Sequence, residues 1–170
     1  VFKGEGATNE GDFHEALNIA AVWDLPVLFM IENNGYGLST PTNEQYRCEN
    51  LADKGKGYGM ESHIVDGNNI LEVFTLISEL KASMVERPRP ILLEFKTFRM
   101  RGHEEASGTK YVPQELMDLW AVKDPVVNYK DFLLQNGILT EAEDAEIKAK
   151  IKQEIDTDWA LANAEPEIEA

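Results

Sequence analysis

Two glycine-rich segments of this sequence combine residue types that could bind a metal ion and a phosphate group. Residues 4–7 read GEGA, residues 33–37 read NNGYG, and 26 residues separate Gly6 from Asn33. Glycines allow the backbone to approach a ligand closely, and the N-terminus of a helix offers free N–H groups to phosphate oxygens. A carboxylate and an amide oxygen are ligands that Mg²⁺ accepts. Together, the two segments predict a site for Mg²⁺ and a diphosphate.

Two familiar phosphate-binding motifs do not explain these segments. A Walker motif has Lys followed by Ser or Thr after its glycines, and neither segment has that pair. A dinucleotide-binding fingerprint requires a third glycine at the position of Asn9. Without further context, the two segments could also be Gly/Asn turns that bind no ligand. Their spacing favours a shared site.

The elements that would position the two segments follow from the spacing of apolar residues. Residues 1–3 resemble the end of a strand, and residues 26–32 form an apolar run typical of a central strand buried on both faces. Between them, residues 12–25 carry apolar side chains at helical intervals, with Asp12 as the N-cap. Because consecutive strands of a parallel sheet end at the same edge, we expect the two glycine-rich segments to face one pocket.

The rest of the chain continues the alternation of strands and helices. The further strands are expected at residues 61–66 and 90–98, the helices at 51–58, 69–86, 113–122, 124–136 and 140–162, and two polar loops at 33–46 and 99–112. This order predicts an α/β fold with a parallel sheet flanked by helices and a helical C-terminal extension. We expect residues 1–137 to form the α/β domain, lacking its N-terminal part, and residues 138–170 to form an acidic helical extension of it.

The charge of the chain argues against two classes of partner. Its 170 residues include 16 Lys and Arg against 31 Asp and Glu, which gives a formal net charge of −15. Nucleic acids and anionic membrane surfaces are bound largely through clustered Lys and Arg. We therefore expect neither nucleic acid nor a membrane as a partner.

The apolar runs, the single cysteine and the first residues give three further expectations. The longest apolar run, residues 26–31, is too short to cross a bilayer. Cys48 is the only cysteine, so no internal disulfide can form, and a reducing, cytoplasmic location is favoured. No initiator Met precedes Val1, which predicts a fragment of a larger polypeptide.

Residues 4–41, GEGATNEGDFHEALNIAAVWDLPVLFMIENNGYGLSTP, resemble the thiamine-diphosphate motif of a known family. That motif is Gly-Asp-Gly followed, after roughly 25 to 30 residues, by Asn-Asn. The form found here is similar to the alpha subunit of the decarboxylating component of 2-oxo acid dehydrogenase complexes. The resemblance extends through residues 61–73 (ESHIVDGNNILEV) and 91–98 (ILLEFKTF) into residues 97–108 (TFRMRGHEEASG), so it covers at least residues 1–137.

The resemblance implies thiamine diphosphate and Mg²⁺ as cofactors, and it assigns them residues. Those implied to approach the diphosphate are Gly4, Gly6 and Ala7, and those implied to hold Mg²⁺ are Glu5, Asn34 and the backbone carbonyl of Tyr36. Glu5 stands where the family motif has aspartate, and its side chain is one methylene longer. Since Mg²⁺ tolerates little distortion of its octahedron, either the loop withdraws slightly or the chain binds its cofactor weakly.

A second implied site lies in the polar loop of residues 99–112. His103 stands at the loop histidine of the family, which implies contact with the substrate carboxylate and orientation of the lipoyl group. Arg99 matches a basic residue that supports this loop, and Arg101 adds to a cationic surface suited to carboxylates. Glu104 occupies the position of a regulatory serine in mitochondrial members, which predicts a bacterial-type chain without kinase control there.

The resemblance also implies an activity and partners. The activity is the oxidative decarboxylation of a 2-oxo acid, with transfer of the acyl group to a lipoyl group. The implied partners are a beta subunit, separate or fused downstream, within a heterotetramer, and a lipoyl acyltransferase, so we expect the 170 residues alone to be inactive. Residues 101–112 (RGHEEASGTKYV) lack the His-Gly-His-Ser-Met-Ser run of pyruvate-type members, which favours branched-chain substrates such as 3-methyl-2-oxobutanoate. Pyruvate and acetoin remain alternatives.

Two other functions are alternatives to this interpretation, and three other residues have simpler roles. A non-catalytic assembly fragment would fold and pair with a beta subunit but lack cofactor affinity, and a transketolase-like enzyme would share only the cofactor motif. His14 and His63 are expected to be packing or hydrogen-bonded histidines. Cys48 is expected to be an ordinary thiol, because neither His nor a second Cys neighbours it in the sequence.

Overall fold

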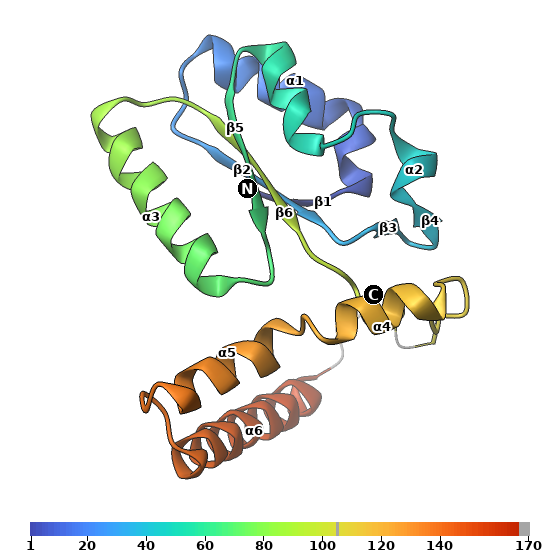
Figure 1. Ribbon diagram of the computed structural model, residues 1–170, viewed down its shortest axis with the longest axis vertical. Helices are drawn as coiled ribbons and strands as arrows, with labels where there is room; N and C mark the ends of the chain where they lie inside the picture. The colour runs from blue at the N-terminus through green and yellow to red at the C-terminus, as the bar shows by residue number, and fades with distance from the viewer. Residues whose placement is uncertain (105, 167–170) are drawn as a thin grey trace. The chain divides into compact units, whose positions relative to one another are not determined.

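The computed structural model describes residues 1–104 and 106–166, which form parts of two compact units, Val1–Pro125 and Val126–Ala170. In the first unit, a four-stranded parallel sheet has the order β1-β2-β6-β5 (Figure 1). Its strands are β1 (Phe2–Gly4), β2 (Leu28–Asn33), β5 (Glu61–Asp66) and β6 (Ile91–Lys96). The predicted α/β fold with a parallel sheet flanked by helices is therefore confirmed.

Helices cover both faces of the sheet. Helix α1 (Gly11–Val22) and the 3₁₀ helix η2 (Leu51–Tyr58) pack on one face, whereas α3 (Ile70–Glu86) packs on the other (Figure 1). The core on the α1 face consists of Phe13, Leu17, Ala20, Phe29, Ile31, Leu51, Met60 and Leu92. The core on the α3 face consists of Val65, Leu80, Met84, Ile91, Leu93 and Phe95. Alternate residues of β6 thus serve opposite cores, as the period of a strand requires.

The strand that is buried on both faces is β6 and not β2. The first five residues of β6 are all buried, whereas in β2 buried residues alternate with more exposed ones. The expectation that the apolar run of residues 26–32 is buried on both faces is therefore wrong, although β2 is central, between β1 and β6. The reason is that α3 leaves Leu28 and Met30 only partly covered, which a hydrophobic run alone does not reveal.

The start of α3 has a side-chain cap, whereas the start of α1 has none. Asn69 is the N-cap of α3, and its side chain accepts a hydrogen bond from the backbone N–H of Glu72. The N-cap of α1 is Glu10, without a side-chain cap, so the predicted capping role of Asp12 is wrong. Asp12 instead lies in the first turn of α1, where a carboxylate favours the positive end of the helix dipole.

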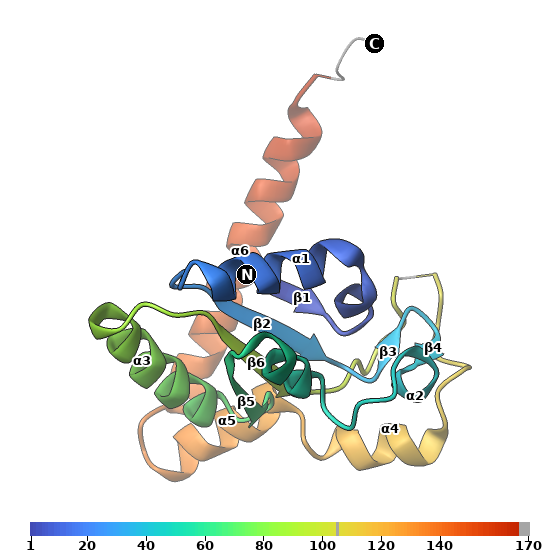
Figure 2. The same cartoon turned by 90° about the horizontal axis from the view of Figure 1, so that it is seen from above.

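The predicted polar loop of residues 33–46 has regular structure within it. A short antiparallel hairpin, β3 (Tyr36–Gly37) and β4 (Thr40–Pro41), is followed by one turn of helix, α2 (Thr42–Gln45). Figure 2 shows the hairpin and α2 beyond the carboxyl end of β2. The first glycine-rich segment leads into a 3₁₀ helix, η1 (Gly6–Asn9). These elements are too short to produce a hydrophobic period, so the sequence pattern could not show them.

The chain after β6 runs through the loop predicted at residues 99–112, where the described residues form no helix or strand. Helix α4 (Gln114–Ala121) follows, and then α5 (Pro125–Gln135) and α6 (Glu141–Ala164). Thr140 and Glu143 form a capping box at the start of α6. The division into domains at residues 137 and 138 stays a prediction. Within the described part of the chain, no helix combines the length and the apolar content needed to span a membrane.

Candidate cofactor site

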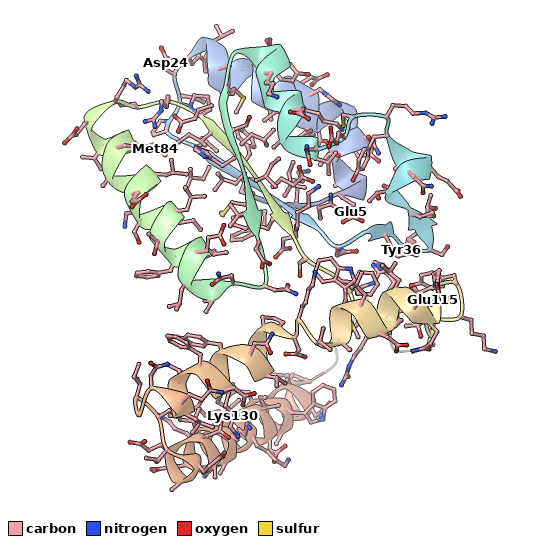
Figure 3. All side chains as sticks on the ribbon, viewed as in Figure 1. Glu5, Asp24, Tyr36, Met84, Glu115 and Lys130 are labelled. Carbon is pink, nitrogen blue, oxygen red and sulfur yellow. The ribbon has the colours of Figure 1, made fainter. Side chains whose placement is uncertain are left out.

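The two glycine-rich segments meet at the carboxyl edge of the sheet, as predicted. Glu5 directly follows β1 and Asn34 directly follows β2, and the backbone N–H of Asn34 donates to Oε2 of Glu5 over 3.2 Å. The Glu5 side chain is only 1% exposed. Glu5 and Tyr36 lie at the same end of the sheet (Figure 3). Parallel pairing in register, with Gly4 opposite Glu32, is what brings the two strand ends together.

A tight turn orders the second segment. Oδ1 of Asn34 accepts a hydrogen bond from the backbone N–H of Tyr36 over 3.2 Å, and Oδ1 of Asn33 accepts one from the N–H of Gly35 over 3.3 Å. Gly35 has a φ of 91°, a conformation that favours glycine. The predicted metal ligands are therefore joined in succession: Glu5 contacts the Asn34 backbone, and the Asn34 side chain contacts the Tyr36 backbone.

Glycines allow the two segments to approach each other closely. A Cβ atom placed on Gly6 would lie 3.6 Å from the Cα of Gly37 and 3.4 Å from Oε1 of Gln45. A Cβ atom on Gly37 would lie 3.0 Å from the same Gln45 oxygen. Gln45 is held in this place by a hydrogen bond from its Nε2 to the carbonyl of Thr40. Gln45 therefore lies close to both glycine-rich segments.

A buried carboxylate supports the second segment from inside the sheet. Glu94, on β6, is fully buried, and its Oε1 accepts hydrogen bonds from Nδ2 of Asn33 over 2.7 Å and from Nζ of Lys96 over 2.6 Å. Its Oε2 accepts one from the backbone N–H of Ala52 over 2.9 Å. Burying a carboxylate without partners is costly, and these contacts offset that cost. Glu94 thus fixes the side chain of Asn33, the residue next to the predicted ligand Asn34.

Tyr46 completes this network. Its hydroxyl accepts a hydrogen bond from Nδ2 of Asn33 over 3.1 Å. Burial raises the pKa of Tyr46 above its ordinary value, and the negative charges of Glu94 and Glu5 raise it further. The Tyr46 hydroxyl therefore stays neutral at neutral pH, so its hydrogen bond with Asn33 is present at that pH.

The structure brings the two residues of the second predicted site together with Tyr36. Nη1 of Arg99 donates to the carbonyl of Tyr36 over 3.3 Å and lies 3.2 Å from Nδ1 of His103. Nη2 donates to the hydroxyl of Tyr111 over 3.1 Å and to the carbonyl of Leu38. Arg99 therefore connects the loop of His103 to the hairpin that follows Asn34. His103 itself is exposed.

Aromatic rings pack around the same hairpin. Phe98 stacks on Trp120 with ring centroids 5.5 Å apart, and Tyr36 contacts both Phe98 and Tyr111 edge-on. A cavity of about 300 Å³ is lined by Asn33, Gly35, Tyr36, Pro41, Thr42, Lys96, Thr97, Phe98, Leu116 and Trp120. The cluster holds the loop after β6 against the hairpin, which places Arg99 within reach of Tyr36.

The donors of the candidate metal site fit Mg²⁺ in chemical type. They are one carboxylate, one amide oxygen and one backbone carbonyl, all hard oxygen ligands. The described residues contain no group of three or more His, Cys, Asp or Glu side chains that could hold a metal ion. Metal binding here would thus depend on Glu5 as the one carboxylate. The Tyr36 carbonyl also accepts from Arg99, and its second lone pair leaves it able to bind a cation as well.

The remaining residues of the sequence analysis are those of the first segment, two histidines and one cysteine. Gly4, Gly6 and Ala7 lie at the start of the first segment, and the first N–H groups of η1 have no partner within that helix. His14 and His63 have hydrogen-bond partners of their own: Nδ1 of His14 is 2.8 Å from the Tyr58 hydroxyl, and Nε2 of His63 is 2.8 Å from Oε1 of Glu61. Cys48 packs against the core on the α1 face and is a free thiol.

Several residues that contact these segments were not predicted, among them Gln45, Glu94 and the half-buried Lys54 of η2. Of these, only Glu94 has a signal in the sequence. It is a charged residue within the apolar run ILLEF, and such a residue must find partners when its strand is buried. Gln45 and Lys54 lie in polar stretches, where nothing in the spacing separates a contact from a solvated side chain.

Comparison with known proteins identifies relatives along the whole chain. Residues 1–170 match the family described as Dehydrogenase E1 component. The chain is 37% identical over 158 residues to 2-oxoisovalerate dehydrogenase subunit alpha 2, mitochondrial, of Arabidopsis thaliana. The matched region covers 91% of this chain and 33% of the relative. The chain is 38% identical over 153 residues to 3-methyl-2-oxobutanoate dehydrogenase subunit alpha of Mycobacterium tuberculosis, covering 89% and 42%.

A relative with a different printed substrate is similar to nearly the same degree. The pyruvate dehydrogenase E1 component subunit alpha of Bacillus subtilis is 34% identical over 168 residues, covering 98% of this chain and 45% of the relative. The chain thus spans between a third and a half of the length of the curated relatives named here.

Proposed function

Since the chain belongs to the Dehydrogenase E1 component family, we propose that it forms the cofactor-binding part of the alpha subunit of a 2-oxo acid dehydrogenase. The proposed activity is the oxidative decarboxylation of a 2-oxo acid, with the acyl group passing to a lipoyl group. The observation that carries the proposal is the succession of contacts from Glu5 through Asn34 to Tyr36 at the carboxyl edge of the sheet. Ligands of α/β proteins bind at this edge.

The proposal assigns thiamine diphosphate and Mg²⁺ to these residues. Glu5, Asn34 and the carbonyl of Tyr36 would hold the metal ion. Gly4, Gly6 and Ala7 would offer their backbone to the diphosphate, with the free N–H groups of η1 beside them. When bound, the cofactor supplies the carbon nucleophile and accepts the electron pair that carbon dioxide leaves behind.

The protein contributes position and charge to this reaction. Burial of Glu5 removes its carboxylate from water, so a cation there would meet a strong field. Arg99 and the exposed His103 would meet the anionic end of the substrate, since a guanidinium pairs with carboxylates in a fixed geometry. The contact of Arg99 with Tyr36 places this positive charge next to the proposed metal ligands.

A branched-chain 2-oxo acid such as 3-methyl-2-oxobutanoate is the preferred substrate in this proposal. Support comes from residues 101–112, which lack the run typical of pyruvate-type members, and from the printed names of relatives that are 37% and 38% identical. Pyruvate is the second candidate, because the Bacillus subtilis relative is 34% identical. Decarboxylation rates with both acids, measured in the presence of a beta subunit, would decide between them.

The proposed partners complete the site. A beta subunit, separate or fused, would pair with this chain in a heterotetramer, and a lipoyl acyltransferase would receive the acyl group. A reducing, cytoplasmic compartment is part of the same proposal and rests on the single Cys48. The 170 residues alone are expected not to turn over substrate.

The test of the proposed function is the binding of thiamine diphosphate, measured by calorimetry with and without Mg²⁺ and with a beta subunit present. The native chain is compared with two variants. Glu5→Asp shortens the side chain of the proposed metal ligand, and Glu5→Gln keeps its length but removes its charge. We expect native chain to bind only with Mg²⁺ and Glu5→Gln to lose at least about tenfold in affinity, the loss expected for one charged contact.

Two outcomes would contradict this expectation. Equal binding with and without Mg²⁺ would remove Glu5 from the metal site. Binding in Glu5→Asp but not in native chain would favour a non-catalytic assembly fragment, whose fold and pocket are intact but whose metal ligand is one methylene too long.

A further inference from the structure

Lys54 makes an unusual set of contacts for a lysine in a polar stretch. Its ammonium donates to the carbonyl of Thr8 over 2.8 Å, to Oγ1 of Thr8 over 3.0 Å and to Oδ1 of Asn9 over 3.3 Å. These are three neutral acceptors for the three donors of the ammonium. All of them belong to η1, which lies 45 or 46 residues earlier in the chain. A lysine that only solubilised η2 would have no reason to reach this loop.

The surroundings of Lys54 hold its ammonium in place. Its Nζ lies 6.0 Å from the ring centre of Phe13 and 5.8 Å from that of Tyr46, distances at which a cation is attracted to a ring face. Burial lowers the pKa of Lys54, which agrees with a side chain that is partly removed from water. The position of the ammonium is therefore set by packing as well as by hydrogen bonds.

Thr8 connects Lys54 to the proposed metal ligand. Thr8 is fully buried, and its Oγ1 donates to the carbonyl of Glu5 over 2.7 Å. The backbone N–H of Thr8 donates to the same carbonyl over 3.1 Å. Lys54 is thus one residue removed from the backbone of Glu5, whose side chain contacts Asn34.

We propose that Lys54 is a positioning residue for the first glycine-rich segment, which it holds so that the Glu5 carboxylate meets the second segment. The proposal rests on the proposed function for its consequence, cofactor binding, but not for the contacts themselves. The same 3₁₀ helix also contacts the support of the second segment, because the N–H of Ala52 donates to Glu94. Helix η2 therefore supports both glycine-rich segments. Lys54 is its contact with the first segment, and Ala52 contacts Glu94, which supports the second.

The matched variants for a test are two residues apart. Lys54→Met keeps most of the aliphatic stem and removes the ammonium. Lys56→Met makes the same change at a side chain that is 73% exposed and pairs with Asp53 on its own helix. Lys54→Arg restores a cationic donor. An effect of net charge alone would be similar in the two methionine variants, whereas a positioning effect belongs to Lys54.

The first readout needs no cofactor. Amide hydrogen exchange is measured by NMR on the full 170-residue chain, at the N–H of Thr8 and at amides of α1 and β2 as internal references. We expect Lys54→Met to speed exchange at Thr8 by about tenfold, the effect of losing a hydrogen bond from a charged donor, with α1 and β2 unchanged. Lys56→Met should match native chain, and Lys54→Arg should recover most of the protection.

The second readout is the affinity for thiamine diphosphate with Mg²⁺, measured by calorimetry with a beta subunit present. We expect about tenfold weaker binding in Lys54→Met and less than about twofold change in Lys56→Met. If native chain does not bind the cofactor at all, the proposed function fails, and exchange at Thr8 decides the role of Lys54 by itself.

Three results would overturn the role of Lys54. They are unchanged exchange at Thr8 in Lys54→Met, equally faster exchange in α1 and β2, which would indicate general destabilisation, and equal loss of affinity in both methionine variants.

Discussion

The carboxylate of Glu94 and those along α6 have the same chemistry in opposite environments. Glu94 is fully buried and contacts Asn33, Ala52 and Lys96. On α6, the pair of Lys152 and Asp156 is 2.7 Å apart, yet the two side chains are 74% and 62% exposed. If a partner is removed on α6, water can take its place, whereas water does not reach the fully buried carboxylate of Glu94. The contribution of these contacts to stability therefore follows their burial and not their distances.

The largest effect that this comparison predicts is at Glu94. Glu94→Ala leaves the buried N–H of Ala52 without its acceptor and removes one of the two acceptors of Asn33 Nδ2. We therefore expect the free energy of unfolding to fall by about 2–3 kcal/mol, since an unsatisfied buried donor costs about 1–3 kcal/mol. Asp156→Ala removes an exposed carboxylate and should change it by less than about 0.5 kcal/mol. Urea unfolding followed by circular dichroism measures both. Similar losses in the two variants would mean that burial does not separate them.

A smaller effect is expected at the start of α6. Oγ1 of Thr140 accepts a hydrogen bond from the backbone N–H of Glu143, and Oε2 of Glu143 accepts one from the backbone N–H of Thr140. Thr140→Ala removes the N-cap, which typically costs about 1 kcal/mol of helix stability. We expect faster amide exchange in the first turn of α6, and no change in β6. Thr157→Ala, in the same helix but away from its start, is the control. Loss of protection in β6 would show that the effect is not local.

The smallest effect is a dependence of stability on pH at Glu61, the first residue of β5. Nε of Arg89 donates to Oε2 of Glu61 over 2.6 Å, and this contact, with a smaller one from His63, lowers the pKa of Glu61. A carboxyl group with a lowered pKa stabilises the fold above its unfolded pKa of about 4.3, and this stabilisation is lost as the pH falls through the folded pKa.

Arg89→Met is therefore expected to be less stable than the native chain at pH 7. The part of this difference that depends on the Glu61 carboxylate should disappear as the pH falls below the lowered pKa of Glu61. The difference should be about 1 kcal/mol or less, since the Glu61 side chain is 32% exposed. Urea unfolding at several pH values measures it, with the exposed Arg87→Met as control. A difference that grows towards acid pH would contradict the sign of the effect.

Local patterns were enough for the regular elements and for part of the site. The strand at residues 61–66 has the predicted bounds, and the long helix after it differs by one residue at its start. Glu5 and Asn34 come together as expected, because parallel strands end at one edge. The hairpin at residues 36–41 was missed, because its strands of two residues are too short to show a period.

The sequence by itself determined the alternation of strands and helices and the placement of two glycine-rich segments at one edge of a parallel sheet. Both follow from periods of two and 3.6 residues, which neighbouring residues carry. The tertiary structure decided which polar side chains support those segments. Glu94 contacts Asn33 across 61 residues and Ala52 across 42, and Lys54 contacts Thr8 across 46. Contacts over such separations depend on how the layers pack, and no local pattern encodes them.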